Sequence, residues 1–273
     1  MEISEQQAAA ALLRWYADMG VDEAVGGAAA DLYAWKAVSE TAARPPAAAR
    51  GAAPPSRPTT PVFQAAEAAP AADEAIEAAR KSAAACPSFE ALQAAVTAFE
   101  GCPLKAGAKN TVFADGVPGS DLLVIGEAPG RDEDRIGKPF VGRAGQLLDK
   151  MLAAIGRSRE TDTLISNVIY WRPPGNRTPT QIETATCRPF VERLIELTAP
   201  KIIVLAGGAP MQALLEITGI MRARGVWREL ELASGARFPV MPIFHPAFLL
   251  RQPANKRLAW ADLQAIEARL RKG

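Results

Sequence analysis

Beyond Asp121 the chain alternates short apolar runs with longer amphipathic segments. Four runs are almost continuously apolar, as expected for strands that helices cover on both faces, and they span residues 122–125, 163–168, 202–205 and 240–244. Amphipathic helices are predicted between and after them, near residues 143–155, 179–197, 208–216 and 253–270. This alternation predicts an α/β fold, a three-layer α/β/α domain with a central four-stranded parallel sheet.

The first hundred residues have a different texture. Residues 5–19 combine many alanines with several large apolar side chains, which predicts a helix within an N-terminal helical extension over residues 1–41. Residues 42–72 are rich in alanine and proline, so few backbone donors remain, and we expect a flexible linker. The main domain, residues 73–273, then begins with a helix to about residue 85 and a second helix, capped by Ser88, that ends near Gly101.

Charge is distributed unevenly along the chain. The first hundred residues hold 7 basic and 13 acidic side chains, which leaves 24 basic and 17 acidic ones for the rest, an excess of +7. This excess suits a polyanionic partner, although many basic domains never contact nucleic acid. The chain begins without the basic segment of a signal peptide, and its best apolar stretch, 202–215, is too short to cross a bilayer. Because the three cysteines are also scattered, we expect a cytoplasmic protein without a membrane partner.

Unusual residues immediately follow each predicted strand. Along the chain these clusters are Gly126-Glu127-Ala128-Pro129-Gly130, Asn167 with Arg172-Pro173-Pro174-Gly175-Asn176-Arg177, Gly207-Gly208, and His245-Pro246-Ala247. The carboxyl ends of parallel strands lie at one edge of a sheet, which is where open α/β sheets bind their ligands. We therefore expect clusters more than a hundred residues apart to converge on one crevice.

The main candidate side chains each have a functional and a structural interpretation. His245 is the only histidine, so imidazole chemistry can occur nowhere else, yet a histidine before proline also serves as a structural residue. Glu127, in a tight Gly/Pro turn, can position water or cap the next helix. Phe140, in the glycine-rich segment 137–145, can stack on a base or fill the core. From the residues alone these alternatives stay open.

Basic side chains occur close to the same clusters. Arg143 lies at the start of a predicted helix, and Arg172 and Arg177 bracket the proline-stiffened loop. Arg251 and Lys256 follow the histidine. Side chains of this kind contact nucleic-acid phosphates or are simply solvated. They are the candidates for contacts to a polyanion.

Taken together, the motifs resemble the bacterial uracil-DNA glycosylases of the fourth, iron-sulfur-containing family. The similarity covers roughly residues 99–265, and the motifs occur in the family's order at suitable separations. They are segment 126–130, Glu133-Asp134, segment 137–145 with Leu147-Leu148-Asp149, Asn167, and segments 172–177 and 245–247. The resemblance implies a DNA N-glycosylase that flips uracil out of single- or double-stranded DNA and hydrolyses its bond to the sugar, the first step of base excision repair. Whether other deaminated bases are also substrates stays open.

The resemblance also implies roles for individual residues. Glu127 would belong to the water-handling motif, and Phe140 would stack on the flipped uracil. Asn167 would read the Watson–Crick edge of the base, and His245 would face its O2 atom. The basic side chains after these motifs would then contact DNA.

One position of the base pocket departs from better-known uracil glycosylases. Ala128, which together with Gly126 would line the pocket, stands where other families place an aspartate that activates water. Uracil leaves as a fairly stable anion, so strong general-base help is less necessary. The identity of any general base is therefore unassigned.

A second departure concerns the cluster of the family. Its four cysteine ligands correspond here to Phe99, Cys102, Trp171 and Cys187, and Cys86 has the wrong spacing to replace either missing thiolate. Iron-sulfur clusters normally need four ligands. We therefore predict a member without this cofactor, in which two aromatic side chains fill the volume of the metal.

Two other classes of function remain as alternatives to the enzyme that the resemblance implies. One is a non-catalytic module of the same fold that binds damaged or single-stranded DNA, and the other is a hydrolase of free nucleosides. We expect a monomer, and the N-terminal extension either docks on the main domain or recruits a repair or replication partner.

Overall fold

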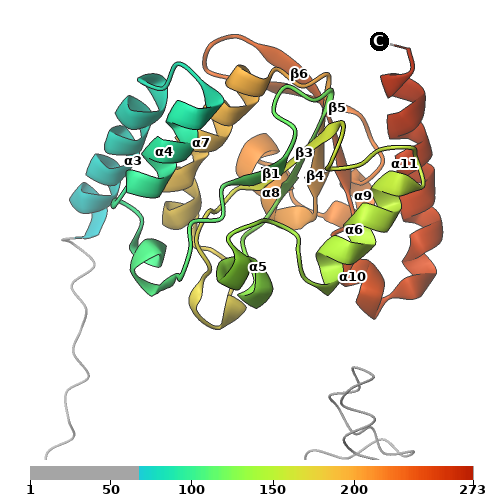
Figure 1. Ribbon diagram of the computed structural model, residues 1–273, viewed down its shortest axis with the longest axis horizontal. Coiled ribbons are helices and arrows are strands. Elements are labelled where there is room, and N and C mark those ends of the chain that lie inside the picture. Colours follow the sequence, from blue (N-terminus) through green and yellow to red (C-terminus); the bar gives the residue numbers. More distant parts are fainter. Residues whose placement is uncertain (1–67, 273) are drawn as a thin grey trace, which may run out of the picture. The chain divides into compact units, whose positions relative to one another are not determined.

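The computed structural model describes residues 68–272 and places one mixed β-sheet between two layers of helices (Figure 1). The strands are β1 (Ala114–Gly116), β2 (Leu122–Gly126), β3 (Thr163–Asn167), β4 (Ile202–Ala206), β5 (Arg228–Glu231) and β6 (Arg237–Ile243). Their order across the sheet is β1-β3-β2-β4-β6-β5. The predicted N-terminal helix and the predicted linker up to residue 67 lie outside the described residues.

The sheet has six strands, so the predicted four-stranded sheet is only its parallel core. β3, β2, β4 and β6 pair in parallel, whereas β1 and β5 pair antiparallel at the two edges. β1 has three residues, and in β5 only Leu230 is buried. Neither strand has the apolar run from which a buried strand is predicted, so the hydrophobic pattern missed both. The three-layer α/β/α architecture is as predicted.

Helices cover both faces of the parallel core. In β2, Leu123 and Ile125 belong to one buried cluster, whereas Leu122 and Val124 belong to the other, because successive strand side chains point to opposite faces. The first face carries α3 (Ala68–Ala84), α4 (Phe89–Ala98), α7 (Gln181–Thr198) and α8 (Gly208–Leu215), and the second carries α6 (Arg143–Ala153), α10 (Pro246–Arg251) and α11 (Lys256–Leu270). Burial on both faces explains why these strands read as continuous apolar runs.

Capping residues place several helix starts close to the predicted positions. The hydroxyl of Ser88 accepts a hydrogen bond from the N–H of Ala91 at 3.2 Å and begins α4. Thr180 and Glu183 form a capping box at the start of α7, where each side chain accepts from the other's N–H. α3 begins at Ala68, earlier than predicted, because a proline in the first turn of a helix removes no hydrogen bond.

Short helices were not predicted because they contain too few residues to show a helical period. They are α5 (Arg131–Ile136), α9 (Ile220–Ala223), α10 and the 3-10 turns η1 (Pro103–Gly107), η2 (Pro174–Asn176) and η3 (Pro253–Asn255). α5 directly follows the residue cluster after β2, and α10 begins within the cluster after β6. Across residues 68–272, no helix has both the length and the apolar character that a membrane span requires.

Candidate active site

A cavity of about 540 Å³ lies at the carboxyl edge of the parallel strands. Glu127 after β2, Asn167 at the end of β3 and His245 after β6 all line it, as does Phe140 from the loop between α5 and α6. The structure thus brings together four side chains that the sequence spreads over more than a hundred residues. Ala128 also lines this cavity, which we call the base pocket.

Gly126 lies where two of these side chains meet. It pairs with Asn167 across β2 and β3, and a Cβ atom at Gly126 would lie 2.4 Å from the Oδ1 atom of Asn167 and 2.5 Å from the ring of Phe140. No side chain fits there. Asn167 is 2% exposed, and its amide makes no hydrogen bond to any residue from 68 to 272. The carboxamide is therefore left for a ligand in the base pocket.

Phe140 has an unusual backbone conformation. Its φ of +52° lies in the left-handed region, which is strained for a bulky side chain. A Cβ atom at Gly145 would lie 1.8 Å from the carbonyl oxygen of Phe140, so the start of α6 approaches this turn closely. The ring stacks on the imidazole of His245, with 5.5 Å between centroids and 27° between planes.

Two charged side chains hold this turn in place. The Arg159 guanidinium donates to the carbonyl oxygens of Pro139 at 3.0 Å and Phe140 at 2.8 Å. The Glu133 carboxylate accepts from the N–H groups of Val141 at 3.0 Å and Gly142 at 2.9 Å. Together they satisfy the backbone on both sides of the aromatic ring, which offsets the strain of its conformation.

His245 is a neutral hydrogen-bond donor near neutral pH. Its Nδ1 atom accepts a hydrogen bond from the N–H of Ala247 at 3.1 Å, so the neutral ring carries its proton on Nε2. Burial and, to a smaller extent, the charge of Arg251 lower the pKa of His245 to about 4, while Glu133 opposes the change. The Gly207-Gly208 cluster does not line the base pocket, but a Cβ atom at Gly207 would lie 3.2 Å from that of His245. Gly207 thus leaves room for the side chain of His245.

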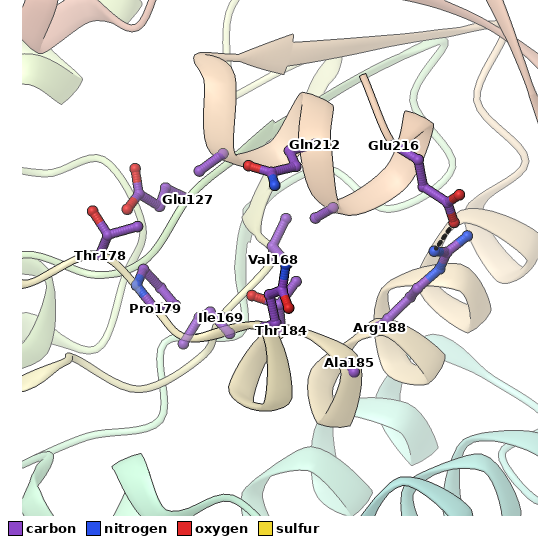
Figure 2. A pocket seen from close by; sticks show the side chains of 13 residues that line it. Glu127, Val168, Ile169, Thr178, Pro179, Thr184, Ala185, Arg188, Gln212 and Glu216 are labelled. Carbon is purple, nitrogen blue, oxygen red and sulfur yellow. Dashed lines mark hydrogen bonds and ion pairs between the residues drawn. The ribbon is translucent and has the colours of Figure 1, made fainter. Parts of the chain in front are cut away.

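Glu127 lies at the boundary between the base pocket and a second cavity of about 430 Å³. Figure 2 shows its carboxylate at one end of the second cavity. Burial raises the pKa of Glu127, and its carboxylate makes no hydrogen bond within the described part of the chain. A partly buried carboxylate without a protein partner must be solvated by water or neutralised by a proton.

The predicted basic residues differ in their contacts and in whether they line the base pocket. Arg143 and Lys256 are exposed at the first positions of α6 and α11, outside the pocket lining. Arg251 is exposed and lines the pocket. Arg172 donates to the side chain of Asn176 at 2.8 Å within residues 172–177, which we call the proline loop. The exposed side chain of Arg251 therefore borders the space that a ligand would enter.

Arg177 lines the base pocket but is engaged within the protein. Its guanidinium makes two hydrogen bonds to the Glu183 carboxylate, at 2.9 and 2.6 Å, and this pair lowers the pKa of Glu183. It also donates to the carbonyl oxygen of Thr178 at 3.1 Å. Arg177 therefore ties the proline loop to the start of α7, and any phosphate contact is additional to that bond.

A parallel core with a pocket at the carboxyl edge of its strands is the arrangement in which open α/β proteins bind ligands, and comparison with known families gives the class of protein. The model of the uracil DNA glycosylase superfamily matches residues 113–264. This match covers more than half of the chain, so the chain belongs to that superfamily.

Individual relatives place it more narrowly. A Type-4 uracil-DNA glycosylase of Thermotoga maritima is 37% identical over 175 residues, which are 63% of this chain and 88% of the relative. The Type-4 enzyme of Archaeoglobus fulgidus is 40% identical over 170 residues, 60% of this chain and 84% of the relative. That of Sulfurisphaera tokodaii is 34% identical over 187 residues, 66% and 83% of the two chains. Within the superfamily, the chain is therefore of the Type-4 kind.

The positions that correspond to cluster ligands do not form a four-thiolate site. Cys102 and Cys187 are buried, and the interaction between their thiols lowers the pKa of Cys102 and raises that of Cys187. The ring of Phe99 packs edge to face on Phe190 with centroids 5.0 Å apart. Trp171 is buried and donates from its indole to a threonine hydroxyl at 3.0 Å. Two thiols and two packed aromatic rings do not fit a [4Fe-4S] cluster.

Sequence reasoning missed the two residues that hold the Phe140 turn. Glu133 lies within a quoted motif, but nothing in the motif shows that its carboxylate caps the backbone of residues 141 and 142. Arg159 lies in a polar stretch before β3 that has no recognisable motif. Its role depends on a contact 19 residues away, which only the tertiary structure reveals.

Proposed function

We propose that the protein is a uracil-DNA glycosylase, which extrudes uracil from DNA and hydrolyses its bond to deoxyribose at the start of base excision repair. The proposal rests on the junction at Gly126, where an unpartnered carboxamide and an aromatic ring border one buried pocket. Superfamily membership and the Type-4 relatives support it. Opening the base stack costs a few kcal/mol, and it costs least at a mispaired uracil.

Base selection is assigned to Asn167 and Phe140. The Asn167 amide donates to O4 of uracil and accepts from N3–H, while cytosine presents the opposite pattern at these two positions. Phe140 stacks on the plane of the extruded base. Gly126 lets both groups approach, and Ala128 completes the wall of the base pocket.

His245 stabilises the leaving group. As the glycosidic bond breaks, the sugar gains positive charge and the uracil ring becomes an anion. The Nε2–H of the neutral imidazole is directed to O2 of this anion, as a donor in an oxyanion hole is. Because the pKa of His245 is about 4, the ring donates this hydrogen bond without carrying a full charge at neutral pH.

Glu127 holds the attacking water and stabilises the positive charge of the sugar. Its carboxylate is free of protein partners within residues 68–272, and Ala128 offers no second carboxylate beside it. The exposed side chains of Arg143, Arg251 and Lys256 contact phosphates of the bound strand, with Arg172 and Arg177 of the proline loop beside them.

The protein works without a [4Fe-4S] cluster. Cys102 and Cys187 supply two thiols where a cluster needs four ligands, and Phe99 and Trp171 occupy the other positions with packed rings. Apolar packing thus takes over the part of the structure that metal ligation would stabilise.

The experiment incubates the protein with a single-stranded oligonucleotide that contains one uracil and then treats it with alkali. Strand cleavage at the uracil position is expected, and it should be lost in Asn167→Asp, whose carboxylate cannot donate to O4. Binding of the oligonucleotide without any released base would instead indicate a non-catalytic DNA-binding module. Release of base from free deoxyuridine but not from the oligonucleotide would indicate a nucleoside hydrolase.

A further inference from the structure

The second cavity shares Glu127 and Thr178 with the base pocket but extends away from it. It is bounded by α7, α8 and the segment after β3. Figure 2 shows Glu127 at one end and the ion pair of Arg188 with Glu216 at the other, with Gln212 and Thr184 between them. The Glu127 side chain thus borders two adjoining spaces.

The lining indicates which ligand the second cavity can take. Arg188 is bound by two carboxylates, those of Glu192 at 2.7 Å and Glu216 at 3.2 Å, so it offers little charge to an anion. The unpartnered carboxylate of Glu127 would repel a phosphate. Amide and hydroxyl groups of Gln212, Thr184 and Thr178 also border the space. The rest of the lining is largely apolar, with Val168, Ile169 and several alanines. A cavity of this volume with a few hydrogen-bonding groups can hold water, which needs two to four polar partners.

Hydrolysis of the glycosidic bond needs a water molecule, which the second cavity can supply. In the proposed complex a DNA strand would cover the mouth of the base pocket and the extruded uracil would lie inside it, so access of bulk water from that side would be restricted. Hydrolysis at C1′ needs an oxygen nucleophile on the face of the sugar opposite the departing base. A second space that ends at the same carboxylate can supply water to that face.

We propose that the second cavity holds and delivers the water that hydrolyses the glycosidic bond, an inference that rests on the proposed function. Water enters between α7 and α8 and is positioned at C1′ by the Glu127 carboxylate. The C1′–N1 bond breaks with its electron pair moving to uracil, and the water oxygen forms a bond to C1′. One water proton passes to Glu127 and then to solvent, and the uracil anion takes up a proton from solvent. The products are uracil and an abasic sugar with a C1′ hydroxyl group.

The test fills the cavity without touching the base pocket. Ala185 on α7 and Ala213 on α8 both line the second cavity and are absent from the base-pocket lining. The double variant Ala185→Leu/Ala213→Leu adds six carbon atoms to this space. Its single-turnover excision rate, which reports the chemical step, should fall at least about tenfold. The KM for the oligonucleotide and the inhibition constant of free uracil should stay unchanged.

Ala268→Leu on the exposed face of α11 is the matched control, and it should excise at the parent rate. If the double variant fails to fold, Gln212→Trp plugs the cavity from an exposed position and should give the same loss of rate. A folded, filled variant with the parent rate overturns the water route. A raised KM with an unchanged single-turnover rate also overturns it, because a DNA base would then occupy the cavity. A parent protein that releases no uracil would instead contradict the proposed function itself.

Discussion

Gly126 shows most directly how one residue shapes the base pocket. The atoms that a Cβ would meet are the Asn167 side chain and the Phe140 ring, both assigned to base recognition. Glu127, Asn167 and His245 were chosen from the sequence because they follow strands, and Phe140 because it lies in a glycine-rich segment. All four border one cavity. Their roles in the reaction remain predictions. Arg159 could not be chosen in this way, since its partners are set by tertiary contacts.

Gly126→Ala should abolish most uracil excision. The added methyl group displaces the carboxamide, the ring or both, and overpacking of this kind costs about 1 to 3 kcal/mol of stability. Single-turnover excision is expected to fall roughly a hundredfold, because misplacing a recognition group by about 1 Å has effects of that size. Gly107→Ala is the matched control, since a Cβ there meets nothing within 4 Å. Equal rates for the two variants would contradict the assigned junction.

Protonation of His245 should make the native state sensitive to acid. The pKa of His245 is about 4 in the folded protein and about 6.5 in the unfolded chain, so the unfolded chain binds the proton more readily. The resulting stability is complete above pH 6.5 and is lost as the pH falls toward 4, by roughly 2 to 3 kcal/mol. Urea unfolding between pH 4 and pH 8 measures it. His245→Gln should lack this contribution, and an identical pH dependence in both proteins would refute the assignment.

At the scale of elements, a few long-range bonds connect the loops to the sheet. Arg159 also pairs with Asp115 of β1 at 3.1 Å and with Asp149 of α6 at 2.8 Å. Burial tends to raise the pKa of Asp115, but hydrogen bonds from Lys138 and Arg159 lower it overall. One guanidinium thus links an edge strand and a helix to the strained turn at Phe140.

Arg159→Ala should weaken base binding as well as stability. Removing a largely buried ion-pair partner costs about 3 to 5 kcal/mol, and the Phe140 turn loses its two carbonyl contacts. The inhibition constant of free uracil should rise at least about tenfold, a change of about 1.4 kcal/mol in affinity. Arg159→Lys keeps the charge but not the planar fork, so it should recover stability better than uracil affinity. A variant that is destabilised but binds uracil normally would limit Arg159 to a structural role.

The sequence predicted strands and helices correctly where the hydrophobic pattern extended over enough residues. Apolar runs buried on both faces located the four parallel strands, and Ser88 marked the start of α4 correctly. The antiparallel edge strands were missed because β1 is only three residues long and β5 exposes three of its four side chains. α5 and α10 were missed because a six-residue helix covers less than two turns.

The four side chains at the positions of the cluster ligands predict a protein that needs no iron. The thiols of Cys102 and Cys187 interact with each other, while Phe99 and Trp171 pack as ordinary aromatic side chains. The purified protein should be colourless, contain no stoichiometric iron and be fully active. The variant Cys102→Ser/Cys187→Ser should keep its excision rate. A brown protein with iron absorbance that loses activity with a chelator would contradict the cluster-free proposal.

For the whole molecule, the basic excess of the chain beyond residue 100 suits a polyanionic substrate. Of the candidate phosphate contacts Arg143, Arg172, Arg177, Arg251 and Lys256, Arg177 and Arg251 line the base pocket, and Arg143 and Lys256 begin helices. Each neutralised phosphate of a single strand contributes about −0.7 to the slope of log binding constant against log salt concentration.

Binding of a single-stranded uracil oligonucleotide should therefore weaken steeply with salt, with a slope of up to about −3.5 for five contacts. Lys256→Ala should reduce this slope by somewhat less than one unit without changing the preference for uracil. Fluorescence anisotropy between 50 and 300 mM salt, roughly the range in which counterion release is measured, gives both slopes. An affinity that does not depend on salt would argue against a DNA substrate.

The central claim is that loops from three parallel strands, together with the Phe140 turn, form one pocket that selects and releases uracil from DNA. Single-turnover excision from matched oligonucleotides containing uracil or cytosine, by the parent protein and Asn167→Asp, tests it most directly. The account predicts rapid release of uracil and none of cytosine by the parent, with uracil release reduced at least about a hundredfold in the variant. Equal uracil excision by both proteins would contradict it.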